Sequence, residues 1–371
     1  MAIIDTKILH IIDTLGLGGA QRIVKDIVEH AYFFETSIVY ALRAKDNEIS
    51  INHQNVFICA SQSKYSLMPL EELRELITKE QITVLHCHLF RSQVMGYWLK
   101  KRYFPHIKLI FHEHGQIVAS DDYNPIMDKL YVQFMRHSVK QVNCYIAVSQ
   151  AIVQALVARA AIPEKQISTL LNFVDLSKFS LEKKESSKKL SISQAKQKFV
   201  VGYAGRIVKR KGWREFLQMA EKLQQIAPEQ FFFLMAGEGT ERALLEKQLV
   251  EKTDYITYLG YCSNMLGFYK SIDCLVMPSY FEGLPMVQLE VMALGVPLIT
   301  ADGLGMTEVA IAQKEALYFP VKNVAMMVEK VQFIAQNPHF AQEMSNDAVK
   351  KASQFGLENY VRKLRQIYAS L

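Results

Sequence analysis

The sequence predicts an α/β chain made of two doubly wound domains, and three observations support this prediction. The chain has 371 residues, and this length suits two domains of about 150–200 residues each better than one core. Half of the residues are hydrophobic, so both domains can bury a core. Short apolar runs alternate with amphipathic stretches along both halves, a pattern typical of parallel sheets covered by helices on both faces.

The apolar runs and the stretches between them can be placed along the chain. The predicted strands of the first half are 7–12, 36–40, 83–86, 109–112 and 144–148, with helices expected at 20–29, 70–79 and 126–139. The predicted strands of the second half are 199–203, 231–236, 256–259, 274–277 and 297–300, with helices expected at 214–227, 242–253 and 286–294. Two such series predict two Rossmann-like domains that face a cleft.

A segment rich in lysine and serine divides the two series. We expect a first domain over 1–178, a linker over 179–195 and a second domain over 196–355. A long surface loop inside one domain is the alternative for the linker. The tail 356–371 has an amphipathic pattern, so we expect a helix that packs back on the first domain.

Composition excludes several classes of protein. The net charge of +6 is mild and spread over both halves, which argues against a nucleic-acid binder. The five cysteines lie far apart without a CxxC pair, so we expect a cytoplasmic protein with neither a disulfide framework nor a cysteine zinc site. The N-terminus lacks the pattern of a signal peptide, and no run of about 18 apolar residues predicts a membrane span.

The strongest chemical signal is the segment 278–290, which follows a predicted strand and opens a predicted helix. Glu282 lies in the loop and Glu290 lies inside the helix, a separation of roughly 12 Å if the span were helical. That length matches a diphosphate with a sugar ring at each end, and the free N–H groups that follow Gly283 suit the anionic bridge between them. The alternative is an acidic helix start with a solvated face, although Leu289 and Val291 flank Glu290 and an unpaired carboxylate there would be costly.

A second signal lies at the end of the predicted strand 199–203, where four basic residues fall within six positions between glycines. Ligands of open α/β sheets bind at such strand ends. Arg206 and Lys211 are placed to neutralise a diphosphate without a metal ion, whereas Lys209 and Arg210 are expected to be solvated. A basic surface turn is the alternative.

Two weaker signals lie in the first half. The glycine-rich turn after the first strand, with Gly18 and Gly19, permits close approach to a ligand at a helix start, although a plain turn explains it equally well. His114 precedes a glycine at another strand end and is a candidate sugar ligand. His112 shares its face of the strand while Glu113 points the other way, so a zinc site here lacks a third ligand close in sequence. We interpret His86 and His88 as structural residues at a strand end.

Together these motifs resemble the retaining glycosyltransferases of family 4, which have the GT-B architecture, and the resemblance covers essentially the whole chain. It rests on Glu282 and Glu290 with the FEGLP sequence before the helix, on the GR…KG loop, on GLGGAQR and on the HG turn. Gln21 stands where many members have glutamate, and Phe173 where glycine is usual. The turn at 301–308 is a loose version of the family's glycine-rich turn.

The resemblance implies an enzyme that moves a hexose or N-acetylhexosamine from a nucleotide sugar, UDP being the expected nucleotide, to a glycan or lipid-linked acceptor in cell-envelope glycan synthesis. It implies catalytic roles for His114, Arg206, Lys211 and Glu282. It implies donor binding by Gly18, Gly19, Tyr261, Cys262, Gly283, Leu284, Pro285, Met286 and Glu290. No cofactor and no metal ion are expected.

An acceptor carried on a lipid is consistent with residues 91–108, where basic and aromatic side chains alternate without an acidic residue. This composition suits an anionic membrane surface, so we expect peripheral attachment to the inner face of the cell membrane. The alternative is a solvated basic face with Trp98 in the core.

Other functions compete with transfer. An NAD-dependent dehydrogenase would need GxGxxG and a later acidic residue, which the first strand does not provide. A nucleotide-sugar epimerase or a non-catalytic nucleotide-sugar-binding protein would share the donor site, and release of UDP that depends on an acceptor distinguishes them from a transferase.

Overall fold

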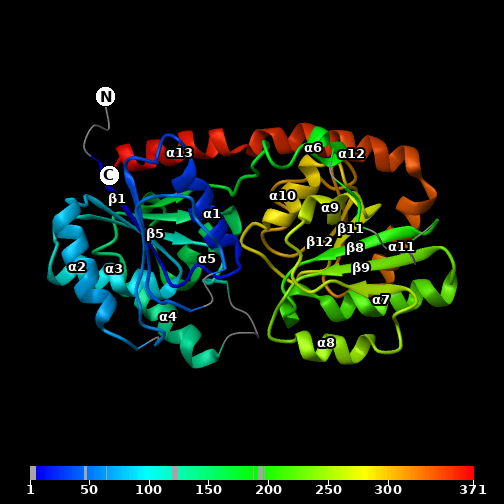
Figure 1. Ribbon diagram of the computed structural model, residues 1–371, viewed down its shortest axis with the longest axis horizontal. Coiled ribbons are helices and arrows are strands. Elements are labelled where there is room, and N and C mark those ends of the chain that lie inside the picture. Colours follow the sequence, from blue (N-terminus) through cyan, green and yellow to red (C-terminus); the bar gives the residue numbers. More distant parts are fainter. Residues whose placement is uncertain are drawn as a thin grey trace. The chain divides into compact units, whose positions relative to one another are not determined.

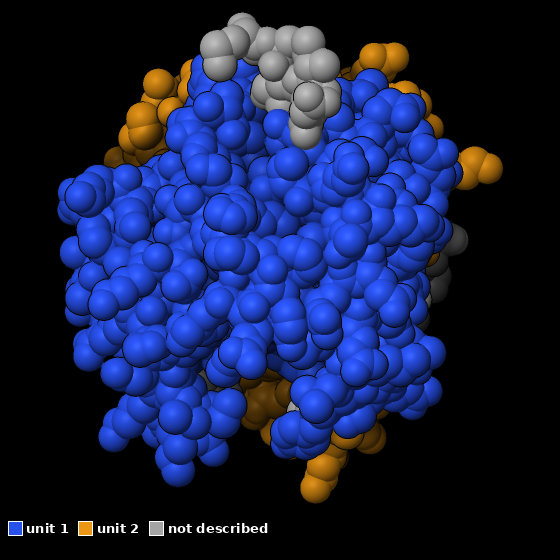
Figure 2. All heavy atoms as spheres, turned by 90° about the vertical axis from the view of Figure 1, so that its left-hand side faces the viewer, with its two compact units in different colours: residues 1–172, 360–371 blue, residues 173–359 orange. Residues whose placement is uncertain are grey.

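The computed structural model describes residues 6–45, 48–63, 65–118, 124–186, 188–190, 195 and 197–371. The chain divides into two compact units, Met1–Asn172 with Tyr360–Leu371 (unit 1) and Phe173–Asn359 (unit 2), which Figure 2 colours separately. Each unit contains one sheet in which all paired strands are parallel. The prediction of two doubly wound α/β domains is therefore confirmed.

The sheet of unit 1 has seven strands in the order β3-β2-β1-β4-β5-β6-β7. The central strands β1, β2 and β4 are buried at every residue, as expected for strands covered on both faces. Figure 1 shows the flanking helices, of which α3 packs against β1, β4 and β5. The elements are β1 (Ile8–Ile12), α1 (Gly19–Glu29), β2 (Ser37–Ala41), β3 (Val56–Ile58), α2 (Met68–Glu80), β4 (Val84–His88), α3 (Phe90–Arg102), β5 (Lys108–Glu113), α4 (Pro125–Ser138), β6 (Cys144–Ala147), α5 (Gln150–Ala160), β7 (Ile167–Thr169) and α13 (Leu357–Ala369).

The sheet of unit 2 has six strands in the order β10-β9-β8-β11-β12-β13. Its central strands are continuous apolar runs, and α7 buries Trp213, Phe216, Leu217, Ala220 and Leu223 at helical spacing. The elements are α6 (Leu181–Ser186), β8 (Phe199–Ala204), α7 (Trp213–Ile226), β9 (Phe231–Ala236), α8 (Arg242–Leu249), β10 (Ile256–Tyr258), α9 (Met265–Lys270), β11 (Cys274–Met277), α10 (Met286–Ala293), β12 (Leu298–Ala301), β13 (Leu317–Phe319), α11 (Val324–Gln336) and α12 (Pro338–Ala352).

The predicted strands all occur within two residues of their expected bounds. The strands that the sequence did not reveal, β3, β7 and β13, have three residues each and lie at the edges of their sheets. Three residues are too few to show an alternating or continuous apolar pattern. Helix α8 ends at Leu249, before the predicted end at residue 253.

The linker and domain boundaries at 178 and 196 stay predictions. Helix α6 lies inside the expected linker and contacts α9, while residues 187, 191–194 and 196 lie outside the described part of the chain. The tail forms α13, whose residues from Tyr360 onward belong to unit 1. Within the described residues no helix is both long and apolar enough to cross a membrane.

Candidate functional site

The order of strands reverses in the middle of the unit 2 sheet. From β8 the chain continues outward to β9 and β10, whereas from β11 it continues outward in the opposite direction to β12 and β13. The loops after β8 and β11 therefore leave neighbouring strands at the point where open α/β sheets bind their ligands. These are the two loops that the sequence singled out, 205–212 and 278–285.

The two loops hold each other in place through their backbones. The N–H of Tyr280 donates a hydrogen bond to the carbonyl oxygen of Arg210 over 2.8 Å. Gly212 adopts a left-handed φ of 67°, and a Cβ there would come within 2.1 Å of the carbonyl oxygen of Pro278. Glycine is therefore required at this position by both conformation and space.

Lys211 and Glu282 form an ion pair between the two loops, through Nζ of the lysine and Oε1 of the glutamate. The side chains are 15% and 8% exposed, so the pair lies largely out of water. Burial lowers the pKa of Lys211 to about 8, although the Glu282 carboxylate opposes this shift. Burial would raise the pKa of Glu282, but the positive charges of Lys211 and Arg210 outweigh it and leave that pKa below the usual value. Both groups are therefore charged at neutral pH.

Two further arginines accompany this pair. Arg206 is exposed on the same loop, and its carbonyl oxygen accepts a hydrogen bond of 3.1 Å from the hydroxyl of Tyr203. Arg210, which we expected to be solvated, is half-buried, and its guanidinium lies 5.1 Å from the ring centroid of Phe281. The expectation for Arg210 was wrong because the aromatic ring one residue before Glu282 covers it, a contact between loops distant in sequence. Lys209 is exposed, as expected.

The segment Gly283, Leu284, Pro285 and Met286 leads into α10, which begins at Met286 after Pro285 at the N-cap. No side chain caps this helix start, so its first N–H groups remain suited to an anion. The glycine-rich turn packs directly against this segment: Gly305 has a φ of 78°, and a Cβ there would lie 2.2 Å from the carbonyl oxygen of Glu282.

Glu290 lies inside α10 and is only 2% exposed. Its Oε2 accepts a hydrogen bond of 2.6 Å from the hydroxyl of Tyr269, on α9. The alternative of a solvated helix face is therefore wrong. Glu290 therefore has a hydrogen-bond partner among its apolar neighbours. This partner could not be predicted from sequence.

Tyr261 and Cys262 follow β10, which is separated from β8 by β9. The N–H of Tyr261 donates to Glu238 Oε1 over 3.1 Å, which ties this loop to the one after β9. The ring of Tyr261 is 56% exposed, while Cys262 is half-buried and burial raises the pKa of its thiol. Both residues thus lie at the same carboxyl edge of the sheet as the two basic and acidic loops, with Tyr261 available for stacking.

In unit 1 the sheet order also reverses, between β1 and β4. Gly18 and Gly19 lie at the start of α1, which has no side-chain cap, so its N–H groups can also receive an anion. Close by in sequence, Asp13 forms ion pairs with Arg43, in the loop after β2, and with Arg91, in the first turn of α3. This cluster was not predicted, because its members are far apart in the chain.

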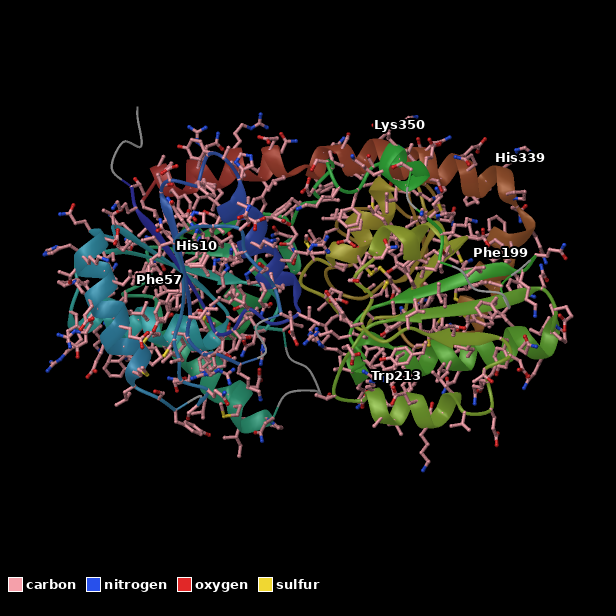
Figure 3. All side chains as sticks on the ribbon, in the orientation of Figure 1. His10, Phe57, Phe199, Trp213, His339 and Lys350 are labelled. Atoms are coloured by element: carbon pink, nitrogen blue, oxygen red, sulfur yellow. The ribbon has the colours of Figure 1, made fainter. Side chains whose placement is uncertain are left out.

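His114 lies at the end of β5 and is partly exposed, and it belongs to a group of five histidines. The strand register places His10 of β1 beside His86 of β4, and His88 of β4 beside His112 of β5. All five lie on one face of the sheet, since residues two apart on a strand share a face. Figure 3 labels His10 among the strands of unit 1.

No third ligand lies close in sequence to His112 and His114, as expected, but the fold brings a distant one near. His88 is distant from His112 in sequence but pairs with it across β4 and β5, and the nitrogens of His88, His112 and His114 lie within 4.8 Å of one another. The expectation that Glu113 points the other way is confirmed: its carboxylate accepts hydrogen bonds from the N–H of Gly115 and the hydroxyl of Tyr131.

Comparisons with known proteins agree with this geometry. Residues 17–178 match the family model described as Glycosyltransferase Family 4, and residues 183–354 match the model described as Glycosyl transferases group 1. Two Rossmann-like units that both match such models define the chain as a glycosyltransferase by class. The chain belongs to the group 1, family 4 type of glycosyltransferase.

Curated relatives are similar at low identity. The lipopolysaccharide core biosynthesis mannosyltransferase LpsB of Rhizobium meliloti is 27% identical over 216 residues, 55% of this chain and 61% of that protein. The capsular polysaccharide biosynthesis glycosyltransferase CapM of Staphylococcus aureus is 22% identical over 230 residues, 60% of each chain. The chain thus matches about three fifths of the length of these relatives.

Among solved structures, HepE of Anabaena in complex with UDP and glucose has a TM-score of 0.83, with 16% identity and coverage of 99% of this chain and 100% of that one. The sucrose-phosphate synthase of Thermosynechococcus elongatus has a TM-score of 0.80, with 18% identity and coverage of 98% of each chain. These likenesses confirm the GT-B fold.

Proposed function

We propose that the protein transfers a hexose or N-acetylhexosamine from a UDP-sugar to a glycan or lipid-linked acceptor in cell-envelope polysaccharide synthesis. The observation that carries this proposal is the buried ion pair of Lys211 and Glu282, between two loops at the switch point of unit 2. Arg206 on the same loop and the uncapped start of α10 add further positive potential. A nucleoside diphosphate with a sugar attached meets both the cations and the carboxylate of this site.

The relatives support the choice of substrates. LpsB and CapM are named for lipopolysaccharide core and capsular polysaccharide synthesis, and HepE was solved with UDP and glucose. A relative from Campylobacter jejuni, 26% identical over 188 residues, is named for the transfer of N-acetylgalactosamine to a diphospho-undecaprenol carrier. These names thus include two classes, polysaccharide synthesis and transfer to a lipid-linked acceptor.

The proposed mechanism follows from where charge develops. As the bond from the anomeric carbon to the phosphate oxygen breaks, negative charge grows on the UDP leaving group, and Lys211 and Arg206 stabilise it. The acceptor hydroxyl attacks from the same face, so the configuration is retained, and the departing phosphate oxygen takes the acceptor's proton. No covalent nucleophile and no metal ion are needed, so transfer persists in excess EDTA.

The other predicted residues bind rather than react. Glu282 accepts hydrogen bonds from the hydroxyls of the transferred sugar, and His114 bonds the same sugar. Glu290 accepts from the ribose, for which it must share its carboxylate with Tyr269. The remaining donor contacts that we propose are backbone contacts of Gly18, Gly19, Gly283, Leu284, Pro285 and Met286, and contacts of Tyr261 and Cys262 with the base.

A donor and acceptor screen tests the proposal. The purified chain is incubated with UDP-sugars, with and without glycan or lipid-linked acceptors, and released UDP is measured. UDP release that requires an acceptor and falls about 100-fold in Glu282→Ala, as for the loss of a transition-state contact, supports transfer. Interconversion of the sugar without UDP release would instead indicate an epimerase, and binding without turnover a nucleotide-sugar-binding protein.

We further infer that unit 1 contacts an anionic membrane through the second half of residues 91–108. Trp98 is 52% exposed and Tyr103 is 38% exposed, which makes the alternative of a core Trp98 wrong. Lys101 and Arg102 are exposed beside them, whereas Lys100 is buried and donates to Asn143 over 2.6 Å. The surface that we propose is therefore narrower than the predicted segment.

Neighbouring α4 carries a separate group of exposed apolar side chains. Its Phe134 packs against Tyr97 of α3, with ring centroids 5.7 Å apart, so the two helices are adjacent. The first turns of α4 expose Ile126, Met127 and Leu130 by 69%, 52% and 55%. This apolar group lies toward the start of α3, because Tyr131 of α4 contacts Phe90, and it is not part of the proposed surface at the end of α3.

Vesicle co-sedimentation tests the membrane proposal. Binding to vesicles with anionic lipid is expected to exceed binding to zwitterionic vesicles, and to fall about fivefold in Lys101→Ala, since one basic residue contributes about 1 kcal/mol near such a surface. Lys350→Ala, an exposed lysine of unit 2, serves as the matched control with unchanged binding. Equal binding to both kinds of vesicle would contradict the proposal.

A further inference from the structure

The five clustered histidines of unit 1 form two hydrogen-bonded rows, one of which reaches Tyr368 of α13. In one row, Nδ1 of His10 lies 3.2 Å from Nε2 of His88, and Nδ1 of His88 lies 3.2 Å from Nε2 of His114. In the other, the hydroxyl of Tyr368 lies 2.6 Å from Nδ1 of His86, and Nε2 of His86 lies 3.1 Å from Nδ1 of His112.

The row that ends at His112 leaves one ring nitrogen available to a ligand. Nε2 of His112 is fully buried and has no hydrogen-bond partner within the described residues. His112 also belongs with His88 and His114 to a group in which one ligand atom of each residue lies within 4.8 Å of the others. A buried polar atom without a partner costs free energy, so a ligand that satisfies it is favoured.

We propose that His88, His112 and His114 bind a divalent transition-metal ion of the zinc class. Two nitrogens on one tetrahedral Zn²⁺ lie about 3.3 Å apart, and the bonded nitrogens of His88 and His114 are 3.2 Å apart. Three imidazoles with a fourth position left for water or another ligand are a common ligand set for Zn²⁺. The rings of His112 and His114 are stacked with centroids 4.2 Å apart, so binding of one ion by both requires these rings to rotate out of the stack.

The surrounding residues orient two of the three ligands. His88 contacts His10 through its Nε2, and His112 contacts His86 through its Nδ1. Each of these ligands thus keeps one ring nitrogen fixed by a neighbouring imidazole while the other faces the ion. Hydrogen bonds of this kind hold metal-ligating histidines in their required orientation. The hydroxyl of Tyr368 extends this support to His86.

Access also favours the outer group of histidines. A second close group, His10, His86 and His88, is fully buried. Only the outer group has a partly exposed member, His114, through which an ion can enter.

This site lies outside the donor loops of unit 2 but shares His114 with the proposed sugar contacts, and metal binding itself does not depend on the proposed function. All three ligands belong to unit 1, and the proposed chemistry of Lys211 and Glu282 uses no metal ion. Bound Zn²⁺ would occupy His114 and keep it from bonding a sugar. Metal binding can therefore be measured directly on the full chain without any assay of transfer.

The test uses the full chain, freed of metal by chelation and dialysis, and titrated with Zn²⁺ by calorimetry and with Co²⁺ by visible absorption. We expect saturable binding of one ion per chain and a Co²⁺ spectrum of tetrahedral type. His112→Gln is expected to weaken binding at least about 100-fold. His339→Gln, on the exposed start of α12 (Figure 3), is the matched control with unchanged affinity.

His10→Gln distinguishes the two histidine groups, because His10 is a ligand only in the inner one. Binding that persists in His10→Gln within about tenfold supports the outer site. Loss of binding in His10→Gln with normal binding in His112→Gln would overturn the assignment. No saturable binding to the unmodified chain, or binding that His339→Gln removes, would overturn the proposal as a whole, even if every variant of the cluster failed to fold.

Discussion

The switch points of the two sheets are alike in topology and different in chemistry. In unit 2 the loops at the switch point carry a buried ion pair, Lys211 and Glu282, with Arg206 and Arg210 on the same loop as the lysine. In unit 1 the more exposed ion pairs of Asp13 with two arginines lie at the switch point, and the neighbouring strands β4 and β5 carry histidines whose pKa values burial depresses. Both edges carry charge, and the edge of unit 1 adds a group of neutral rings.

The difference shows what each edge is able to bind. Cations stabilise a phosphate leaving group, and a buried cation needs a counter-ion such as Glu282 when the phosphate is absent. Neutral imidazoles do not repel a cation and can donate or accept a single hydrogen bond, so they suit sugar hydroxyls or a metal ion. The same topology thus leaves the choice of ligand to a few side chains at the strand ends.

The largest effect on the rate of transfer is expected from removing the charge of Lys211. Lys211→Ala should lower kcat/KM for transfer about 100-fold, because the charge that stabilises the leaving group is lost. Steady-state UDP release measures this, with circular dichroism to show that the variant is folded. Lys209→Ala, the exposed lysine on the same loop, should change the rate by less than about twofold. An equal loss of kcat/KM in both variants would show that the rate depends on the overall surface charge of the loop and not on Lys211 in particular.

The pH dependence of transfer should also distinguish the two units, because Lys211 of unit 2 titrates in the alkaline range and His114 of unit 1 does not titrate near neutral pH. With a pKa of about 8, Lys211 loses its proton as the pH rises, so kcat/KM should fall about tenfold per pH unit above that value. No loss is expected between about pH 5 and pH 7, since the pKa of His114 is about 3 and the Glu282 pKa lies below its usual value. In Lys211→Arg the alkaline fall should disappear, because arginine stays charged. A fall near pH 6.5 that His114→Gln removes would show that His114 titrates in water, contrary to its burial.

A smaller effect is expected on the stability of unit 1. Tyr368→Phe removes the hydroxyl that bonds His86 over 2.6 Å and leaves a buried ring nitrogen without that partner. The free energy of unfolding should fall by about 1–3 kcal/mol, measured by urea denaturation. Tyr103→Phe, a half-exposed tyrosine of α3, should change it by less than about 0.5 kcal/mol. A Tyr368→Phe variant as stable as the parent would mean that water replaces the hydroxyl.

Much of the fold and of the unit 2 site could be predicted from sequence. The strands β8, β9 and β11 are continuous apolar runs, so their positions and the loops that follow them were visible. Arg206, Lys211 and Glu282 stood out because they lie within short segments beside glycine and proline. The contacts of Glu290 with Tyr269 and of Arg210 with Phe281 were not visible, since each joins segments separated by 21 and 71 residues.

The histidine cluster shows the limit most clearly. The sequence shows that His86 and His88 share one face of a strand, and likewise His112 and His114. Two neighbouring histidines alone are too few ligands for a metal site. The register of β4 against β5 places His88 beside His112, and that register depends on the packing of the whole sheet.

The sequence by itself determined the alternation of strands and helices, the two parallel sheets and the charged loops after β8 and β11, because hydrophobic periodicity and glycine positions are local properties of the chain. Tertiary structure alone decided that Lys211 pairs with Glu282, that Tyr269 covers Glu290 and that five histidines share one face. Those contacts join residues far apart in the chain, and only the order and register of strands in the folded sheets bring them within bonding distance.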